Sequence, residues 1–230
     1  MTDASGPALL RAEALECGYG GLPVTSALDL VMEPGDRVGV VGGNAAGKST
    51  LVRTLVGDQE PVAGRVRLEG LPVTPESAAH RRALSVLTDE DAWFPTLTVA
   101  EHLTLVALGH GVADPDAAVA RELEFFALRE AADALPSRLS SGQRRRLLLA
   151  AALLRPFRVL ALDEPEQRLD AGMRERLTRR LAGLDPAAAL LLVTHDPEVL
   201  TGAATRCLVV DGDVREAGAA EGAAWIRERT

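Results

Sequence analysis

The chain contains a single lysine, Lys48, which lies in the stretch GGNAAGKST at residues 42–50. The chain has 25 lysines and arginines in all, so arginine fills every other basic position, and position 48 selects a compact ammonium group. The stretch fits the pattern G-x-x-x-x-G-K-[ST], whose glycines let backbone N–H groups converge on a phosphate. A glycine turn with an incidental lysine is the alternative, but a predicted strand before the stretch and a predicted helix after it favour a phosphate loop.

The phosphate loop (residues 42–50) predicts binding of a nucleoside triphosphate. Lys48 is expected to reach the β- and γ-phosphates, and the Ser49 hydroxyl is expected to bind Mg²⁺. The residues predicted to contact the nucleotide are Gly42, Gly43, Asn44, Ala45, Ala46, Gly47, Lys48, Ser49 and Thr50.

Two further carboxylates end an apolar run, VLALDEP, at residues 159–165. Asp163 is expected to hold Mg²⁺ through a water, and Glu164 to polarise the attacking water as a general base. An acidic turn after a core strand is the alternative. The phosphate loop in the same chain favours the catalytic interpretation.

The hydrophobic pattern predicts strands that alternate with helices around these residues. Strands are expected at 37–42, 64–70, 83–88, 158–165, 189–196 and 205–213. Helices are expected after Lys48, from Thr98 and Asp114, at 141–154, and along Met173, Leu177 and Leu181. The pattern predicts one α/β domain over residues 1–230, with a core at about 1–88 and 155–230 and an all-helical insertion at about 90–154.

Composition excludes several classes of function. A net charge of −8 argues against nucleic acid as a partner, because phosphate backbones are bound by clustered cations. Cys17 and Cys207 form neither a metal pattern nor a disulfide framework, which indicates a reducing compartment. No apolar run approaches the roughly 20 residues that span a bilayer, and the first residues lack the plan of a signal peptide. We therefore expect a cytoplasmic protein.

Four short stretches together resemble the ABC ATPases, over about residues 9–213. LSSGQRRRL at 139–147 resembles the ABC signature, and LLVTHD at 191–196 resembles the segment that carries the switch histidine, here His195. EQRLD at 166–170 resembles the D-loop, with Asp170, and CGYGG at 17–21 contains Tyr19, which matches the family's adenine-stacking aromatic residue.

The resemblance implies a P-loop NTPase core with an N-terminal antiparallel β region and a helical subdomain. It also implies that ATP lies between the phosphate loop of one subunit and the signature of another, in a head-to-tail dimer, homo- or heteromeric. The signature residues implied are Ser140, Ser141, Gly142 and Gln143. His195 would lie near the γ-phosphate. The alternative interpretation of Tyr19 is a packing residue without a nucleotide contact, and that of His195 is a residue that caps the following helix. Arg144, Arg145 and Arg146 are interpreted as a solvated or subunit-facing helix side without chemistry.

Three positions depart from the family pattern. Ala45 stands where a glycine is frequent, which requires only that φ be negative there. Ser141 replaces the first signature glycine. Asp89 stands where a metal-site glutamine is expected, so it is a predicted Mg²⁺ ligand, and Glu90 takes that role if the alignment shifts by one residue.

The function predicted by this resemblance is an ATP-hydrolysing subunit that powers transport through separate transmembrane permease subunits. The protein would be peripheral at the inner face of the cell membrane. The run SSGQRRRL and the short C-terminal part are more similar to export than to import subunits. The alternatives are a soluble ABC ATPase that acts on a protein assembly, and a nucleotide-dependent dimerisation switch with negligible turnover, against which Glu164 argues.

Overall fold

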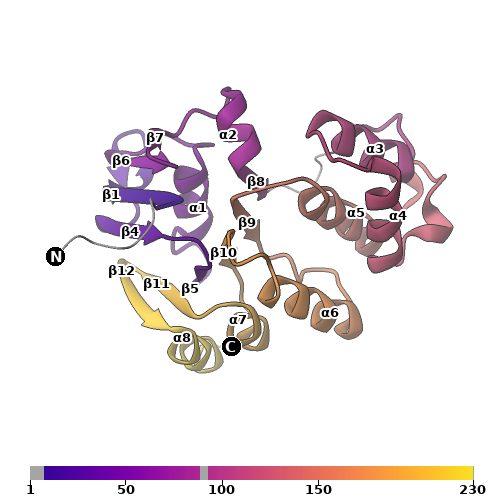
Figure 1. Ribbon diagram of the computed structural model, residues 1–230. Helices are drawn as coiled ribbons and strands as arrows, with labels where there is room; N and C mark the ends of the chain where they lie inside the picture. The colour runs from indigo at the N-terminus through magenta and orange to yellow at the C-terminus, as the bar shows by residue number, and fades with distance from the viewer. Residues whose placement is uncertain (1–7, 89–92, 230) are drawn as a thin grey trace.

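A six-stranded sheet forms the centre of the computed structural model, which describes residues 8–88 and 93–229 (Figure 1). Its strand order is β12-β11-β5-β10-β9-β8, and all neighbours are parallel except β12 and β11. The strands are β5 (Arg37–Gly42), β8 (Leu84–Leu87), β9 (Val159–Asp163), β10 (Ala189–Val193), β11 (Arg206–Asp211) and β12 (Asp213–Gly218). Every residue of β5 and β10 is buried, because both faces of a parallel sheet are covered.

A second, antiparallel sheet is formed mainly by the N-terminal part of the chain, with strand order β4-β1-β6-β7. Its strands are β1 (Leu10–Glu16), β4 (Leu28–Met32), β6 (Ala63–Leu68) and β7 (Leu71–Pro72), and a small hairpin joins β2 (Gly18–Tyr19) to β3 (Leu22–Pro23). Helix α1 (Lys48–Val56) contributes Leu51, Val52 and Leu55 to one apolar cluster that includes residues of both sheets. The antiparallel sheet therefore fixes the helix that follows the phosphate loop.

The helices between the two halves of the central sheet form a separate group, at the right of Figure 1. They are α3 (Val99–Gly109), α4 (Pro115–Phe125) and α5 (Ser141–Leu154), with 3-10 turns at Arg129–Ala131 and Pro136–Arg138. Reciprocal caps start two of them, since Thr98 pairs with Glu101 and Ser140 with Gln143. We call residues 93–154 the helical insertion.

The helical insertion is attached to the core by packing and by one ion pair. Its apolar cluster continues into α6 (Ala171–Ala182), where Met173, Leu177 and Leu181 are buried. Arg180 of α6 donates two hydrogen bonds, of 2.8 and 2.6 Å, to the buried carboxylate of Glu122 in α4. The insertion therefore does not pack against the core through apolar contacts alone.

The predicted α/β fold with its antiparallel region is confirmed, and each predicted strand and helix is present. The resemblance implied the antiparallel region without the ranges of its strands, and three further elements outside that region were not predicted: α2 (Ala78–Ala83), β12, and α8 (Ala219–Arg227). In β12, Val214 and Ala217 are the only apolar residues, and α2 contains two arginines, so neither shows a clear apolar period. The chain also contains α7 (Pro197–Ala203). Across the described residues, no helix has the length and apolar character to cross a bilayer.

Candidate functional site

The predicted site residues converge because three neighbouring parallel strands end together. Val193, at the end of β10, pairs with Val40 of β5 on one side and with Asp163 of β9 on the other. The phosphate loop follows β5, the acidic turn (residues 163–167) ends β9, and the switch loop (residues 194–196) follows β10. Carboxyl ends of parallel strands share one edge of a sheet, where ligands of such folds bind.

The phosphate loop has a left-handed backbone at two positions. Gly47 has φ of 100°, and a Cβ there would lie 3.1 Å from Thr25 Cγ2, so glycine is needed at this position. Ala45 has φ of 61°, so the expectation of a negative φ was wrong. The curvature of the loop requires the left-handed region at this residue, and alanine adopts it at a cost of roughly 1 kcal/mol.

Lys48 begins α1 and is 6% exposed. Its Nζ donates hydrogen bonds to the carbonyl oxygens of Gly42, at 3.1 Å, and Gly43, at 2.8 Å. Burial lowers the pKa of the Lys48 ammonium, and the nearby carboxylates of Glu164 and Asp163 oppose that shift. The loop thus encloses one positive charge close to both acidic residues.

Ser49 and Asp163 lie together across the edge of the sheet. Burial raises the pKa of the Asp163 carboxyl, while a hydrogen bond from the Ser49 side chain lowers it. A hydroxyl and a carboxylate held together are hard oxygen donors of the kind that Mg²⁺ accepts alongside waters. The two residues therefore fit the predicted Mg²⁺.

Glu164 is held from several sides. Its Oε1 lies 3.1 Å from His195 Nε2, and its Oε2 accepts a hydrogen bond from Gln167 Nε2. Its backbone N–H donates to the Val193 carbonyl at 2.9 Å. Its φ of 46° is rare for a residue with a side chain, and such strain is concentrated at functional sites. The contact between Glu164 and His195 joins the predicted base to the predicted switch histidine.

The structure corrects the interpretation of Arg145 as a solvated residue. Arg145 is 7% exposed, and its guanidinium donates hydrogen bonds of 2.7 Å to the carbonyls of both Asp163 and Glu164. A run of three arginines on one helix concealed this, because only one of the three faces the acidic turn. Arg144 instead lies over the Trp93 ring, and Arg146 donates to the Phe126 carbonyl.

Tyr19 stands beside the phosphate loop with its ring open to solvent. The side chain is 57% exposed, and its hydroxyl shares a hydrogen bond of 3.1 Å with the Thr50 hydroxyl. A packing residue would be covered, so this position agrees better with a ring that a base can stack on.

The signature segment begins α5, inside the helical insertion and away from α1 (Figure 1). Ser140 and Ser141 are exposed, and the Ser140 hydroxyl accepts a hydrogen bond from the Gln143 N–H at 3.2 Å. A Cβ at Gly142 would lie 2.9 Å from the Arg168 carbonyl oxygen, so glycine is required there. The structure does not bring this segment to the phosphate loop of the same chain.

The remaining predicted residues either lie next to helix starts or fall outside the described residues. Asp170 caps α6 through a hydrogen bond of 2.9 Å from the Met173 N–H. Asp196, and not His195, caps α7, so the capping alternative for His195 is wrong. Asp89 and Glu90 lie outside the described residues.

Sequence reasoning missed four residues that hold the acidic turn and the switch loop in place: Glu166 and Gln167 within the turn, Thr194 within the loop, and Arg145 on α5. Glu166 is 8% exposed and Thr194 is fully buried, and the two are hydrogen-bonded. A charged residue two positions after Glu164 was the available signal, but it was read only as part of the D-loop.

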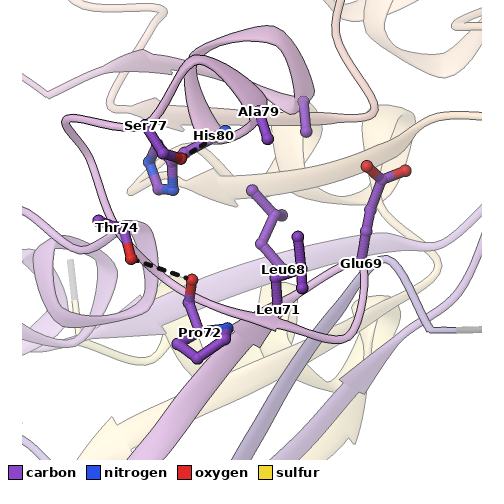
Figure 2. A pocket seen from close by; sticks show the side chains of 9 residues that line it. Leu68, Glu69, Leu71, Pro72, Thr74, Ser77, Ala79 and His80 are labelled. Carbon is purple, nitrogen blue, oxygen red and sulfur yellow. Dashed lines mark hydrogen bonds between the residues drawn. The ribbon is translucent and has the colours of Figure 1, made fainter.

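A hollow of about 650 Å³ adjoins this region, lined by Glu164, Glu166, Arg168, Arg174 and His195, among others. A smaller one, of about 240 Å³, lies between α2 and the turn from β6 to β7 (Figure 2). Its walls include Leu68, Leu71 and His80 and no predicted site residue, which separates it from the nucleotide chemistry.

The fold and this site define a nucleotide-binding cassette. Residues 25–167 match the family model described as ABC transporter. The Nod factor export ATP-binding protein I of Rhizobium etli is 34% identical over 197 residues, covering 84% of this chain and 62% of that protein. The aliphatic sulfonates import ATP-binding protein SsuB 1 of Rhizobium johnstonii is 38% identical over 213 residues, covering 90% and 75%. A dimeric cassette solved in a post-hydrolysis state with ADP and Pi superimposes with a TM-score of 0.81 at 21% identity, covering 91% and 98%.

The chain therefore belongs to the ABC transporter family, whose cassettes are ATPases. The predicted family and fold are confirmed. The chain spans 62% of the length of the Nod factor relative.

Proposed function

We propose that this chain binds ATP with Mg²⁺, hydrolyses it, and powers transport through separate transmembrane subunits at the inner face of the membrane. The proposal that the chain hydrolyses ATP rests mainly on one observation, the 3.1 Å contact between Glu164 and His195 beside the phosphate loop. The pair is held by the chain itself, so the base is oriented before a substrate arrives.

Each residue has one role in this proposal. The phosphate-loop N–H groups and Lys48 bind the phosphates, and Tyr19 stacks on the adenine. Ser49 and Asp163 would hold Mg²⁺, which when bound supplies charge stabilisation to the phosphates. Glu164 accepts the proton of the attacking water, and His195 orients Glu164 and the γ-phosphate. Ser140, Ser141, Gly142, Gln143 and Asp170 act on the nucleotide of a second subunit in a head-to-tail dimer.

The proposed permease surface lies on the helical insertion. Phe94, Leu105 and Leu108 are 52%, 44% and 62% exposed, although large apolar side chains favour burial. Leu108 also lines a hollow of about 350 Å³ together with Arg81, Arg82 and His110. Apolar side chains beside guanidinium groups fit a short amphipathic segment that carries carboxylates.

Co-purification from membranes tests the transport proposal. The double variant Leu105→Asn and Leu108→Asn should lose at least about tenfold in association with the transmembrane subunit, while the isolated chain keeps its ATPase rate. Leu71→Asn is the matched control, because Leu71 is 59% exposed on the antiparallel sheet. Capture of a soluble assembly in place of a membrane subunit would favour the alternative of a soluble ABC ATPase.

The direction of transport can be measured with the complex of this chain and its transmembrane subunits reconstituted in vesicles. The signature run favours export, and the two relatives are one export and one import protein. ATP-driven accumulation inside inside-out vesicles is the result expected for export.

A further inference from the structure

Glu166 lies between the two loops that carry the predicted base and the predicted switch histidine. It belongs to the acidic turn, two residues after Glu164, and is 8% exposed. Its Oε1 accepts a hydrogen bond from the hydroxyl of Thr194, which is the residue before His195. The nearby backbone N–H of His195 also lowers the pKa of this carboxyl group. One side chain therefore holds Thr194 through a hydrogen bond and lies close to the backbone of His195, the next residue of the switch loop.

The direction of these hydrogen bonds requires an acceptor at position 166. The Thr194 hydroxyl accepts a hydrogen bond of 3.0 Å from the Asp196 N–H, and its single proton is directed at Glu166. Thr194 is fully buried, so in the folded wild type its hydroxyl has no contact with solvent that could replace that acceptor. An apolar side chain at position 166 would leave the hydroxyl proton without its carboxylate acceptor.

The strands themselves do not hold the two loops together at this point. The ladder between β9 and β10 ends at the pair Asp163 and Val193, and one backbone hydrogen bond, from the Glu164 N–H to the Val193 carbonyl, follows it. Beyond that bond, two side chains of the acidic turn reach the switch loop: Glu166 accepts the hydrogen bond from Thr194, and Glu164 lies 3.1 Å from His195.

The Glu166 carboxyl is an unusual group to bury. Burial raises its pKa, and hydrogen bonds from Thr194 and from two backbone N–H groups, its own and that of His195, oppose the rise. Asp196 adds to the rise, since it is a second acid nearby. Within the described residues, the Glu166 Oε2 atom has no hydrogen-bond partner. Burying a carboxyl group costs free energy of desolvation, so its presence here indicates a role beyond packing.

We propose that Glu166 is a positioning residue for ATP hydrolysis, which fixes His195 against Glu164 by holding Thr194, the residue before His195. This inference rests on the proposed roles of Glu164 and His195. Among the described residues no hydrogen bond or ion pair joins Glu166 to the phosphate loop, so we expect nucleotide affinity to be independent of it.

Kinetics of five variants test the proposal. Glu166→Ala should lower kcat about tenfold or more, because small displacements of reacting groups are costly, and should leave the Kd for ATP unchanged. Glu166→Gln keeps an oxygen acceptor, so its kcat should stay within about twofold of the wild-type value. Thr194→Val should match Glu166→Ala, and the double variant should be no slower than either single variant. Glu198→Ala is the control, since Glu198 is an exposed acid on the rim of the same hollow.

A second measurement separates this proposal from the ATPase assignment. The chain has four histidines, so the imidazole signals in proton–carbon NMR spectra are few enough to assign by substitution. In Glu166→Ala the His195 signal should move, while the His80, His102 and His110 signals stay in place. A spectrum that also loses those three signals reports unfolding, and Thr194→Val then carries the test, because it should move the His195 signal and lower kcat in the same way.

The proposal is overturned by a Glu166→Ala protein with wild-type kcat, by equal losses in kcat and ATP affinity, or by an unmoved His195 signal. If the wild type itself does not hydrolyse ATP, the ATPase assignment fails while the NMR result still decides whether Glu166 positions His195.

Discussion

The catalytic core and the helical insertion present their site residues in opposite ways. In the core, Lys48 is 6% exposed and bonded to its own loop, and Glu164 is held by His195 and Gln167. In the insertion, Ser140 and Ser141 are exposed, and the Ser140 hydroxyl serves to cap α5. The core thus holds the residues of the proposed reaction centre in contact with one another, whereas the insertion exposes its proposed site residues to solvent. This difference supports a site completed by a second copy of the chain or by a similar subunit.

The largest effect is expected in the core, at Glu164. Glu164→Gln keeps the shape of the side chain but cannot take a proton from water, so kcat should fall by about 10² or more. ATP binding should persist, and the ATP-bound dimer should accumulate, which light scattering detects. Glu198→Gln, at an exposed acid nearby, should keep the wild-type rate. Hydrolysis by Glu164→Gln at that rate would mean that another group is the base.

Lys48 gives the next largest effect, on binding. Lys48→Ala removes the enclosed charge and should weaken ATP binding by up to about 10²-fold. Lys48→Arg should fail similarly, because a planar fork cannot occupy the slot where Nζ meets the carbonyls of Gly42 and Gly43. Nucleotide titration measures both. Near-normal affinity of the arginine variant would contradict our explanation of the single lysine.

A substitution in the insertion should separate binding from turnover. Ser141→Glu places a negative charge where the partner's phosphates are proposed to lie, so the ATPase rate should fall at least about tenfold. ATP binding by the isolated subunit should be unchanged, since its own phosphate loop is intact. Equilibrium titration with ATP measures the unchanged binding, and steady-state ATPase assays measure the lower rate.

Mixing experiments sharpen the same comparison. A heterodimer of Lys48→Ala and Ser141→Glu subunits contains one site built from an intact phosphate loop and an intact signature. Partial recovery of activity over either variant alone is the expected result. Absence of recovery at concentrations where mixed dimers form would argue against composite sites.

The sequence predicts the secondary structure of the backbone better than it predicts the contacts between side chains. The strand ALLLV is apolar throughout and RVGVVG has no polar side chain after Arg37, and the caps at Thr98 and Asp114 are local signals, so these elements follow from neighbouring residues. Lys48, Asp163 and Glu164 were predicted because their spacing is fixed by strand, loop and helix. Arg145 and Glu166 were not, because their partners lie 18 and 28 residues away and depend on the packing of separate strands.

The phosphate loop adds one failure of a different kind. Ala45 was expected at negative φ, since alanine avoids the left-handed region, yet the loop imposes φ of 61°. Local propensity gave the wrong answer because the path of the loop between β5 and α1 outweighs it.

The smallest effect we predict concerns the stability of the insertion and its dependence on pH. His102 in α3 is 2% exposed, and neither of its ring nitrogens has a hydrogen-bond partner within the described residues. The Phe94 ring lies 5.9 Å from it, between centroids. Burial lowers the pKa of His102 below its ordinary value, so the folded protein holds the imidazole neutral.

The sign of the pH dependence follows from that shift. Below the unfolded pKa of about 6.5 the unfolded chain binds a proton that folded His102 resists, so stability is complete above about pH 6.5 and falls as the pH drops toward the folded pKa. The loss is at most about 1.4 kcal/mol per pH unit for this group. His102→Leu removes this titrating group. In urea unfolding, the free energy of unfolding of the variant minus that of the wild type should therefore increase as the pH falls from about 8 to about 5.5. His110→Leu is the matched comparison and should show a smaller change, because His110 is only partly buried. An advantage of His102→Leu that stays constant with pH would mean that His102 is protonated in the folded insertion without penalty.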